Sequence, residues 1–319
     1  MKRVLIGALS VAMGLAVVSG AHAADKKILA FVTNGSSDFW KAAAAGVAKA
    51  QTELPDYTLQ FKWTDPATAA TQTQELNDLV SAGAAGIMIS AVDPKTESDT
   101  LKGIAGQTLL LTTDSDAKDS GRVAYIGSSN VLAGNQVGEL LKKAMPNGGK
   151  CMAFVGLPGA DNAKERLQGI NDVIKGTQIT IVDVRADNID LPTAKRNVED
   201  TLTAHPEVNC MLGIYSYNIP QIYQALKEAN MLGKVTVTGF DDDPVTLGGV
   251  KEGTVAGTVV QQPFEWGYQG MKLMADVLKG DKSKIPADTL VIVPTKIVDQ
   301  ASVDQYSKDL AAIQASVKK

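Results

Sequence analysis

The architecture of this chain is indicated by the segment Lys27-Ile28-Leu29-Ala30-Phe31-Val32-Thr33-Asn34-Gly35-Ser36-Ser37-Asp38-Phe39-Trp40. Its apolar run from Ile28 to Val32 is continuous, which is typical of a strand covered on both faces in a parallel sheet. A polar turn follows, and a helical pattern begins near Asp38. A strand that leads through a polar turn into a helix predicts the α/β class, in which ligands bind beyond the strand ends.

The same alternation of strands and helices occurs in two sets. The first set has predicted strands at 27–33, 58–63, 86–90, 107–112 and 123–126, with helices at 38–53, 68–82 and 95–105. The second set has strands at 151–156, 179–185, 210–215, 235–240 and 255–261, with helices at 131–145, 161–175, 191–204, 219–229 and 244–252. We therefore expect two doubly wound parallel-sheet lobes.

A helix at 264–279, a strand at 289–293 and a short helical tail end the chain. These elements are too few for a third domain, so we expect them to complete the two lobes. The chain would then cross between the lobes more than once and form a multi-strand hinge, with a ligand cleft between facing strand ends. The expected bounds are 24–127 plus 262–289 for the N-terminal lobe and 128–261 plus 290–319 for the C-terminal lobe.

The first 23 residues have the layout of a secretory signal peptide. Lys2 and Arg3 precede an apolar run at 4–18, and Ala21-His22-Ala23 fits the cleavage rule for small residues. No cysteine lies directly after the apolar run, so we expect a periplasmic protein without a lipid anchor. The formal net charge of −4, without basic clusters, argues against nucleic acid as a partner, and we expect a monomer.

Cys151 and Cys210 are the only cysteines, and each opens a short apolar run. If those runs are neighbouring parallel strands, the two residues lie one strand spacing apart, close to disulfide distance. In an oxidising compartment they could pair; the alternative is two buried thiols. Two cysteines without clustered histidines do not make a metal site.

Polar and aromatic residues follow the predicted strands. They comprise Ser37, Asp38, Phe39 and Trp40 after the first strand, Asp114 and Ser115 after the fourth, and Arg166, Tyr215, Asp241 and Gln261 in the second set. Carboxylates and amides accept hydroxyl hydrogen bonds, arginine donates in a planar fork, and aromatic rings suit sugar C–H faces. No phosphate-binding glycine loop is present, so we expect no cofactor.

Each of these residues also has a structural alternative. Phe39 could act as a hydrophobic staple with Ser37 or Asp38 as the helix N-cap, and Asp114 could lie in a solvated turn. Arg166 could pair with Glu165 on the surface. His205 lies in a helix-end turn, and we interpret it as structural.

Several segments in order give the chain a resemblance to a known family, the periplasmic sugar-binding proteins of ABC importers. The branch is that of the ribose-, galactose- and allose-binding proteins, with the periplasmic binding protein-like I fold. The resemblance covers residues 27 to about 295. It is carried by Ser37-Asp38-Phe39-Trp40, the Asp114 turn, 125–134, Lys164-Glu165-Arg166, 202–208, 237–241 and 257–261.

The resemblance implies roles for individual residues. Phe39 and Trp40 would sandwich the sugar, Asp114 would bind two hydroxyls, and Arg166 would reach the ring oxygen or a hydroxyl. Asp241 and Gln261 would complete the polar ring. Three positions differ from the ribose-binding pattern: Ser115 replaces an arginine, Tyr215-Ser216 replaces Asn-Asp, and Ser37-Asp38 replaces an asparagine. These differences change which hydroxyls can be paired.

The function that the resemblance implies is capture of a monosaccharide or polyol and its delivery to an ABC-type permease, without catalysis. The alternatives are a furanose signalling compound or a chemoreceptor ligand. An exported carbohydrate-active enzyme using Asp114 and Asp241 as its carboxylate pair is a further alternative. A serine hydrolase is disfavoured, because no G-x-S-x-G turn is present.

Overall fold

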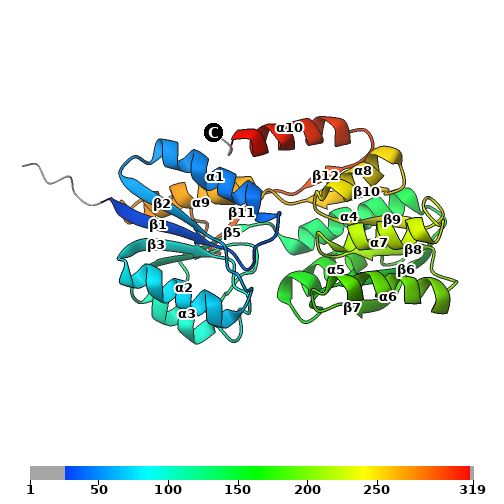
Figure 1. Ribbon diagram of the computed structural model, residues 1–319, viewed down its shortest axis with the longest axis horizontal. Helices are drawn as coiled ribbons and strands as arrows, with labels where there is room; N and C mark the ends of the chain where they lie inside the picture. Colours follow the sequence, from blue (N-terminus) through cyan, green and yellow to red (C-terminus); the bar gives the residue numbers. More distant parts are fainter. Residues whose placement is uncertain (1–25, 317–319) are drawn as a thin grey trace, which may run out of the picture.

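The computed structural model describes residues 26–316, which form two α/β lobes lying side by side (Figure 1). The first lobe contains β1 (Lys27–Val32), α1 (Trp40–Glu53), β2 (Tyr57–Lys62), α2 (Ala69–Ser81), β3 (Ala84–Ile89), α3 (Ser98–Ala105), β4 (Leu109–Thr112), β5 (Ala124–Gly127), α9 (Pro263–Leu278) and β11 (Leu290–Ile292). The second contains α4 (Asn130–Ala144), β6 (Gly149–Val155), α5 (Asp161–Ile174), β7 (Ile179–Ala186), α6 (Leu191–Ala204), β8 (Cys210–Gly213), α7 (Asn218–Glu228), β9 (Thr236–Phe240), α8 (Pro244–Glu252), β10 (Gly257–Val260), β12 (Lys296–Val298) and α10 (Val303–Ser316).

Each lobe is built on one six-stranded sheet. The strand orders are β11-β5-β4-β3-β1-β2 and β12-β10-β9-β8-β6-β7, so β4 and β9 occupy corresponding places. Every pairing in the first sheet is parallel, and in the second only β12 is antiparallel, beside β10. The predicted fold of two doubly wound lobes is confirmed.

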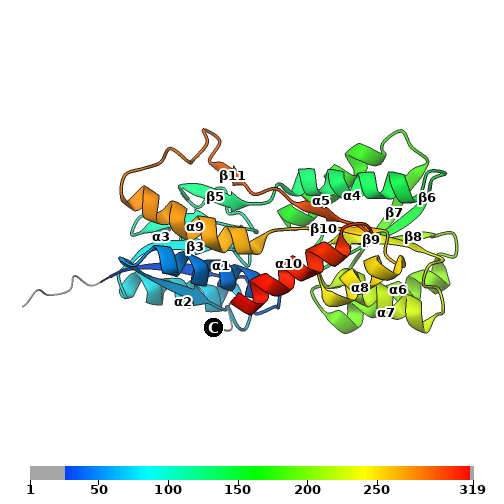
Figure 2. The same cartoon turned by 90° about the horizontal axis from the view of Figure 1, so that it is seen from above.

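The chain crosses between the lobes at three places, as Figure 2 shows: after β5, after β10 and after β11. The predicted boundary at 289/290 is wrong by one short strand. Leu290–Ile292 pair with Tyr125–Gly127 of β5, so β11 belongs to the first sheet and the third crossing follows it. The expected signal peptide lies outside the described residues. Within 26–316, no helix is long and apolar enough to cross a membrane.

Two pairs of glycines let helices cross at backbone contact. In the first lobe, a methyl group at Gly46 of α1 or at Gly267 of α9 would overlap a carbonyl oxygen of the other helix. In the second lobe, Gly134 of α4 faces the carbonyl of Arg166, and Gly169 of α5 faces that of Val131. Only glycine lets the two backbones approach this closely. The crossing of α4 and α5 therefore fixes where α5 lies along α4, and with it the position of Arg166.

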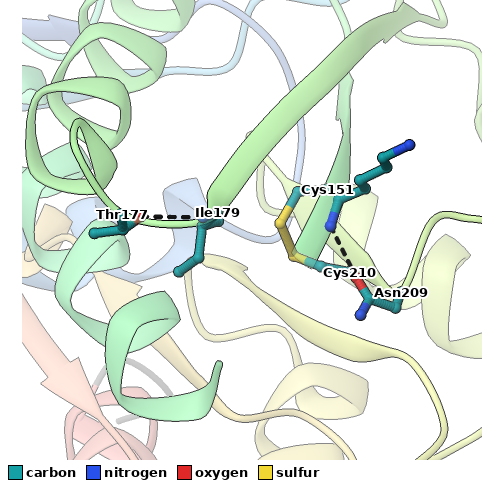
Figure 3. Close-up of a disulfide and its surroundings, with 6 residues drawn as sticks. Cys151, Thr177, Ile179, Asn209 and Cys210 are labelled. Carbon is teal, nitrogen blue, oxygen red and sulfur yellow. Dashed lines mark hydrogen bonds between the residues drawn. A yellow bond between two sulfur atoms is a disulfide. The ribbon is translucent and has the colours of Figure 1, made fainter. Parts of the chain in front are cut away.

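A disulfide joins Cys151 of β6 to Cys210 of β8 (Figure 3). The two residues are direct partners in the parallel pairing, with their Cα atoms 4.3 Å apart, and both are fully buried. Nearby, Asn209 Oδ1 accepts a hydrogen bond from the backbone N–H of Lys150 at 2.9 Å. Of the two alternatives that the sequence left for Cys151 and Cys210, the structure shows the disulfide, in the core of the second lobe.

Candidate functional site

Asp114 follows β4 and is held in the left-handed backbone region, with φ of 51°. Its Oδ2 accepts hydrogen bonds from Ser90 Oγ at 2.9 Å and from Asn34 Nδ2 at 3.2 Å. Ser115 donates its backbone N–H to the same Ser90 hydroxyl at 3.4 Å. Burial raises the pKa of the Asp114 carboxyl, while the charge of Arg166 and these hydrogen bonds act in the opposite direction.

Trp40 supports Asp114 indirectly and is not open to a ligand. Its ring is 2% exposed and packs against Phe31 and Trp266, within the core under α1 and α9. Its indole N–H donates to Asn34 Oδ1 at 3.1 Å, which turns the Asn34 amide N–H₂ toward Asp114. The expectation that Trp40 offers a ring face to a sugar is therefore not met here, because Trp266, far away in the sequence, helps to bury it.

The other three residues of that predicted cluster stay near the surface. Phe39 is half-buried, with its ring edge-on to Trp40 at 5.0 Å. Ser37 and Asp38 are exposed, and Asp38 pairs with Lys41 at 2.7 Å. Neither caps α1, since the N-cap residue is Phe39 and has no side-chain hydrogen bond. The negative charge of Asp38 raises the pKa of Asp243 in the other lobe, although burial of Asp243 has the larger effect.

Arg166 is the central group contributed by the second lobe. It is 2% exposed, and it donates from Nε to Asn130 Oδ1 at 3.0 Å and from Nη1 to the carbonyl of Ile214 at 2.8 Å. Its guanidinium carbon lies 4.5 Å from the centroid of the Phe240 ring. The alternative pairing with Glu165 is wrong: Glu165 accepts from Lys118 and Asn130 instead.

Asp241 follows β9, at the place that corresponds to Asp114 after β4. It is 3% exposed, has φ of 70°, and its Oδ1 accepts from Gln261 Nε2 at 3.1 Å. Burial raises the pKa of its carboxyl, and Arg166 and Gln261 oppose that rise. Two non-glycine residues at corresponding strand ends thus adopt a costly conformation, which is a mark of functional sites.

One positive charge therefore acts on two acids from different sheets. Burial raises the pKa of both Asp114 and Asp241, and the charge of the Arg166 guanidinium opposes that rise at each of them. Asp114 follows β4 of the first sheet, and Asp241 follows β9 at the corresponding place of the second. The two carboxyl groups can accept hydrogen bonds from hydroxyl groups, and the planar guanidinium can donate hydrogen bonds to them.

Tyr215 lies on the same side of the second lobe, after β8. Its hydroxyl is 3.1 Å from Asn162 Oδ1, and burial raises the pKa of the phenol to about 12. The charges of Arg166, Asp114 and Asp187 all act on this phenol. Tyr215 thus follows β8, the neighbour of β9 in the second sheet, and Gln261 contacts Asp241 after β9.

The sequence reading missed a second layer of polar residues. Asn34, Ser90 and Asn130 hold Asp114 and Arg166 in place. All three lie in or beside the turns that follow strands, and this position is the sequence signal that marks them.

Asp187, after β7, was also missed. Its buried carboxylate accepts from the Tyr217 hydroxyl at 2.6 Å and from Asn218 Nδ2 at 2.9 Å. It also accepts from the backbone N–H of Ile189, an exposed residue with φ of 63°. This network fixes the loop that presents Ile189 at the end of the second sheet.

Among residues 26–316, no group of three or more His, Cys, Asp or Glu side chains could hold a metal ion.

Comparison with known proteins finds relatives over most of the chain. Residues 28–282 match the family model described as "Periplasmic binding protein domain". The ribose import binding protein RbsB of Salmonella typhimurium is 28% identical over 230 residues, which are 70% of this chain and 76% of that protein. The corresponding RbsB of Haemophilus influenzae is 27% identical, over 92% of this chain and 99% of that protein.

A solved structure shows the same similarity. The solute-binding protein of an ABC transporter from Burkholderia graminis, in complex with D-arabinose, has a TM-score of 0.81 and 28% identity. The match covers 88% of this chain and 97% of that chain.

Proposed function

Because the chain belongs to the periplasmic binding protein domain family, we propose that it captures a monosaccharide or related polyol between its lobes and delivers it to an ABC-type permease. The observation that carries the proposal is that Asp114 and Asp241 occupy corresponding strand ends of the two sheets with positive φ, and that the charge of the buried Arg166 acts on both. A ligand that bonds to both lobes at once would favour their approach about the three crossings. Export to the periplasm fits the signal-like first 23 residues.

The charge of the site favours an uncharged ligand. Burial raises the pKa of both Asp114 and Asp241, which indicates that the site disfavours negative charge, so a phosphate or carboxylate on the ligand would be costly to bury there. A sugar hydroxyl can donate to Asp114 or Asp241 and accept from Arg166. Pentoses are the first choice to test, since similar proteins are described as binding ribose or D-arabinose.

A thermal-shift panel tests this proposal. D-ribose, D-arabinose, D-xylose, D-allose, D-galactose and myo-inositol are compared with ribose 5-phosphate as the charged control. A ligand at about one hundred times its Kd stabilises the folded protein by about 2.7 kcal/mol. We expect at least one neutral compound to raise the Tm and the phosphate ester to leave it unchanged. A flat response to all neutral compounds would contradict sugar binding.

Asp114→Ala provides the site-specific test. The variant loses two partly buried hydrogen bonds and the acceptor that a hydroxyl would use, so the sugar-induced Tm shift should disappear. Asp119→Ala, at an exposed position five residues on, is the matched control and should respond like the wild type. Product analysis after long incubation with the bound sugar tests for turnover; any product would favour the carboxylate-pair enzyme instead.

A further inference from the structure

The C-terminal helix α10 lies outside residues 28–282, the part of the chain that matches the family model. It begins on the second lobe against α8 and ends beside α1 of the first lobe, as both views show (Figures 1 and 2). The helix therefore bridges the lobes in addition to the three crossings.

The first turns of α10 are anchored to the second lobe. Val303 is buried in the core that α7 and α8 cover, and Tyr306 and Leu310 pack against the same core. The spacing of three and four residues puts these side chains on one face of the helix. On the polar side, Asp304 pairs with Lys251 of α8 at 2.7 Å.

Tyr306 connects this anchor to the proposed ligand site. Its hydroxyl donates to Asp242 Oδ2 at 2.7 Å, and Asp242 directly follows Asp241. Asp241 itself holds φ of 70° and contacts Gln261 beside the second crossing. A bond that fixes Asp242 therefore helps to fix the strained backbone of its neighbour.

We propose that α10 is a strap between the lobes and that Tyr306 is a positioning residue for Asp241. Val303, Tyr306 and Leu310 tie the first turns of α10 to the second lobe, and its later turns lie beside α1 of the first. The helix thereby links the loop that carries Asp241 to the placement of the first lobe. The Tyr306 role rests on the proposed sugar-binding function; the strap does not.

The strap is tested without any ligand. Spin labels on Gln74→Cys of α2 and Asp200→Cys of α6 report the distance between the lobes, and both positions are exposed. The two native cysteines are buried in a disulfide and do not compete for label. Ala311→Pro, at an exposed position of α10, breaks its later turns, and Ala311→Ser is the matched control. We expect the proline variant to broaden or shift the distance distribution and the serine variant to leave it unchanged. An unchanged distribution in Ala311→Pro would overturn the strap.

The positioning role is tested with Tyr306→Phe, which keeps the packed ring and removes the hydroxyl. We expect the Kd for the sugar found in the thermal-shift panel to rise about threefold to tenfold, as for an indirect loss of one charge-assisted hydrogen bond. Asp242→Asn retains an acceptor for Tyr306 and should weaken binding less. Equal Kd values for wild type and Tyr306→Phe would refute the role of Tyr306. If wild type binds no sugar, the proposed function fails, and the interlobe distances still decide the strap.

Discussion

Arg166 is the residue on which both acids of the site depend. Its buried guanidinium satisfies Asn130 and the carbonyl of Ile214, and its charge opposes the burial of Asp114 and Asp241. A buried cation in this setting has a structural role and a binding role at the same time. The two roles can be separated by measuring stability and affinity on the same variant.

Arg166→Lys keeps the charge but loses the planar fork, so Asn130 and the Ile214 carbonyl cannot both keep their partners. We expect a loss of about 1–3 kcal/mol in the free energy of unfolding, measured with urea, together with weaker sugar binding. Arg196→Lys, on the exposed face of α6, should change stability by less than about 0.5 kcal/mol. A neutral effect of Arg166→Lys on both quantities would show that the fork is dispensable.

Asp242 predicts a pH dependence of stability. Burial raises the pKa of its carboxyl from 3.8 to about 6; the nearby Asp241 and Asp243 charges add to the rise, and the Tyr306 bond opposes it. Between those values the folded protein holds a proton that the unfolded chain has released. Stability contributed by this group is therefore lost as pH rises from about 4 to 6. Urea unfolding at pH 4, 5 and 6 should show wild type losing stability relative to Asp242→Asn; parallel pH profiles would argue against this.

At the scale of elements, a glycine-mediated helix crossing sets the position of Arg166. The crossing of α4 and α5 at Gly134 and Gly169 brings Arg166 within reach of Asn130, the first residue of α4. The first lobe uses the same device for α1 and α9, at whose contact Trp40 and Trp266 are buried. Arg166 is thus placed by a helix packing that a single methyl group would disturb.

Gly169→Ala should therefore destabilise the protein by about 1–3 kcal/mol or more, because the new Cβ would overlap the Val131 carbonyl. The matched control is a glycine at which alanine should stabilise the protein. Gly103 lies inside α3, with nothing within 4 Å of an added Cβ, so Gly103→Ala should stabilise by up to about 1 kcal/mol. Thermal unfolding of both variants checks the pair, and similar effects at the two sites would be incompatible with the crossing argument.

The sequence predicted the elements well where local pattern determines them. The apolar runs of β1, β6 and β8 and the helices between them are local features, and Asp114, Arg166 and Asp241 stood out as polar residues after strands. The burial of Trp40 was not predictable, because a paired aromatic at a helix start has the same pattern whether it faces a core or a ligand. The partner that decides it, Trp266, lies on the ninth helix. The sequence also could not predict which lobe contains β11, since a three-residue strand can complete either sheet.

At the scale of the whole molecule, two lobes of similar design are joined by three crossings and bridged by α10. Asp114 belongs to the first lobe and Asp241 to the second, so a ligand bound to both acids would be held by both lobes. Closing of the lobes on the ligand is therefore the central claim of the proposed function. Without closing, the pairing of corresponding strand ends would have no role in capture.

The most direct test of that claim is the distance between spin labels at positions 74 and 200 before and after the bound sugar is added. The account predicts a shift to shorter distances in wild type, and no shift when Asp114 is replaced by alanine. A sugar that binds wild type with an unchanged distance distribution would contradict it.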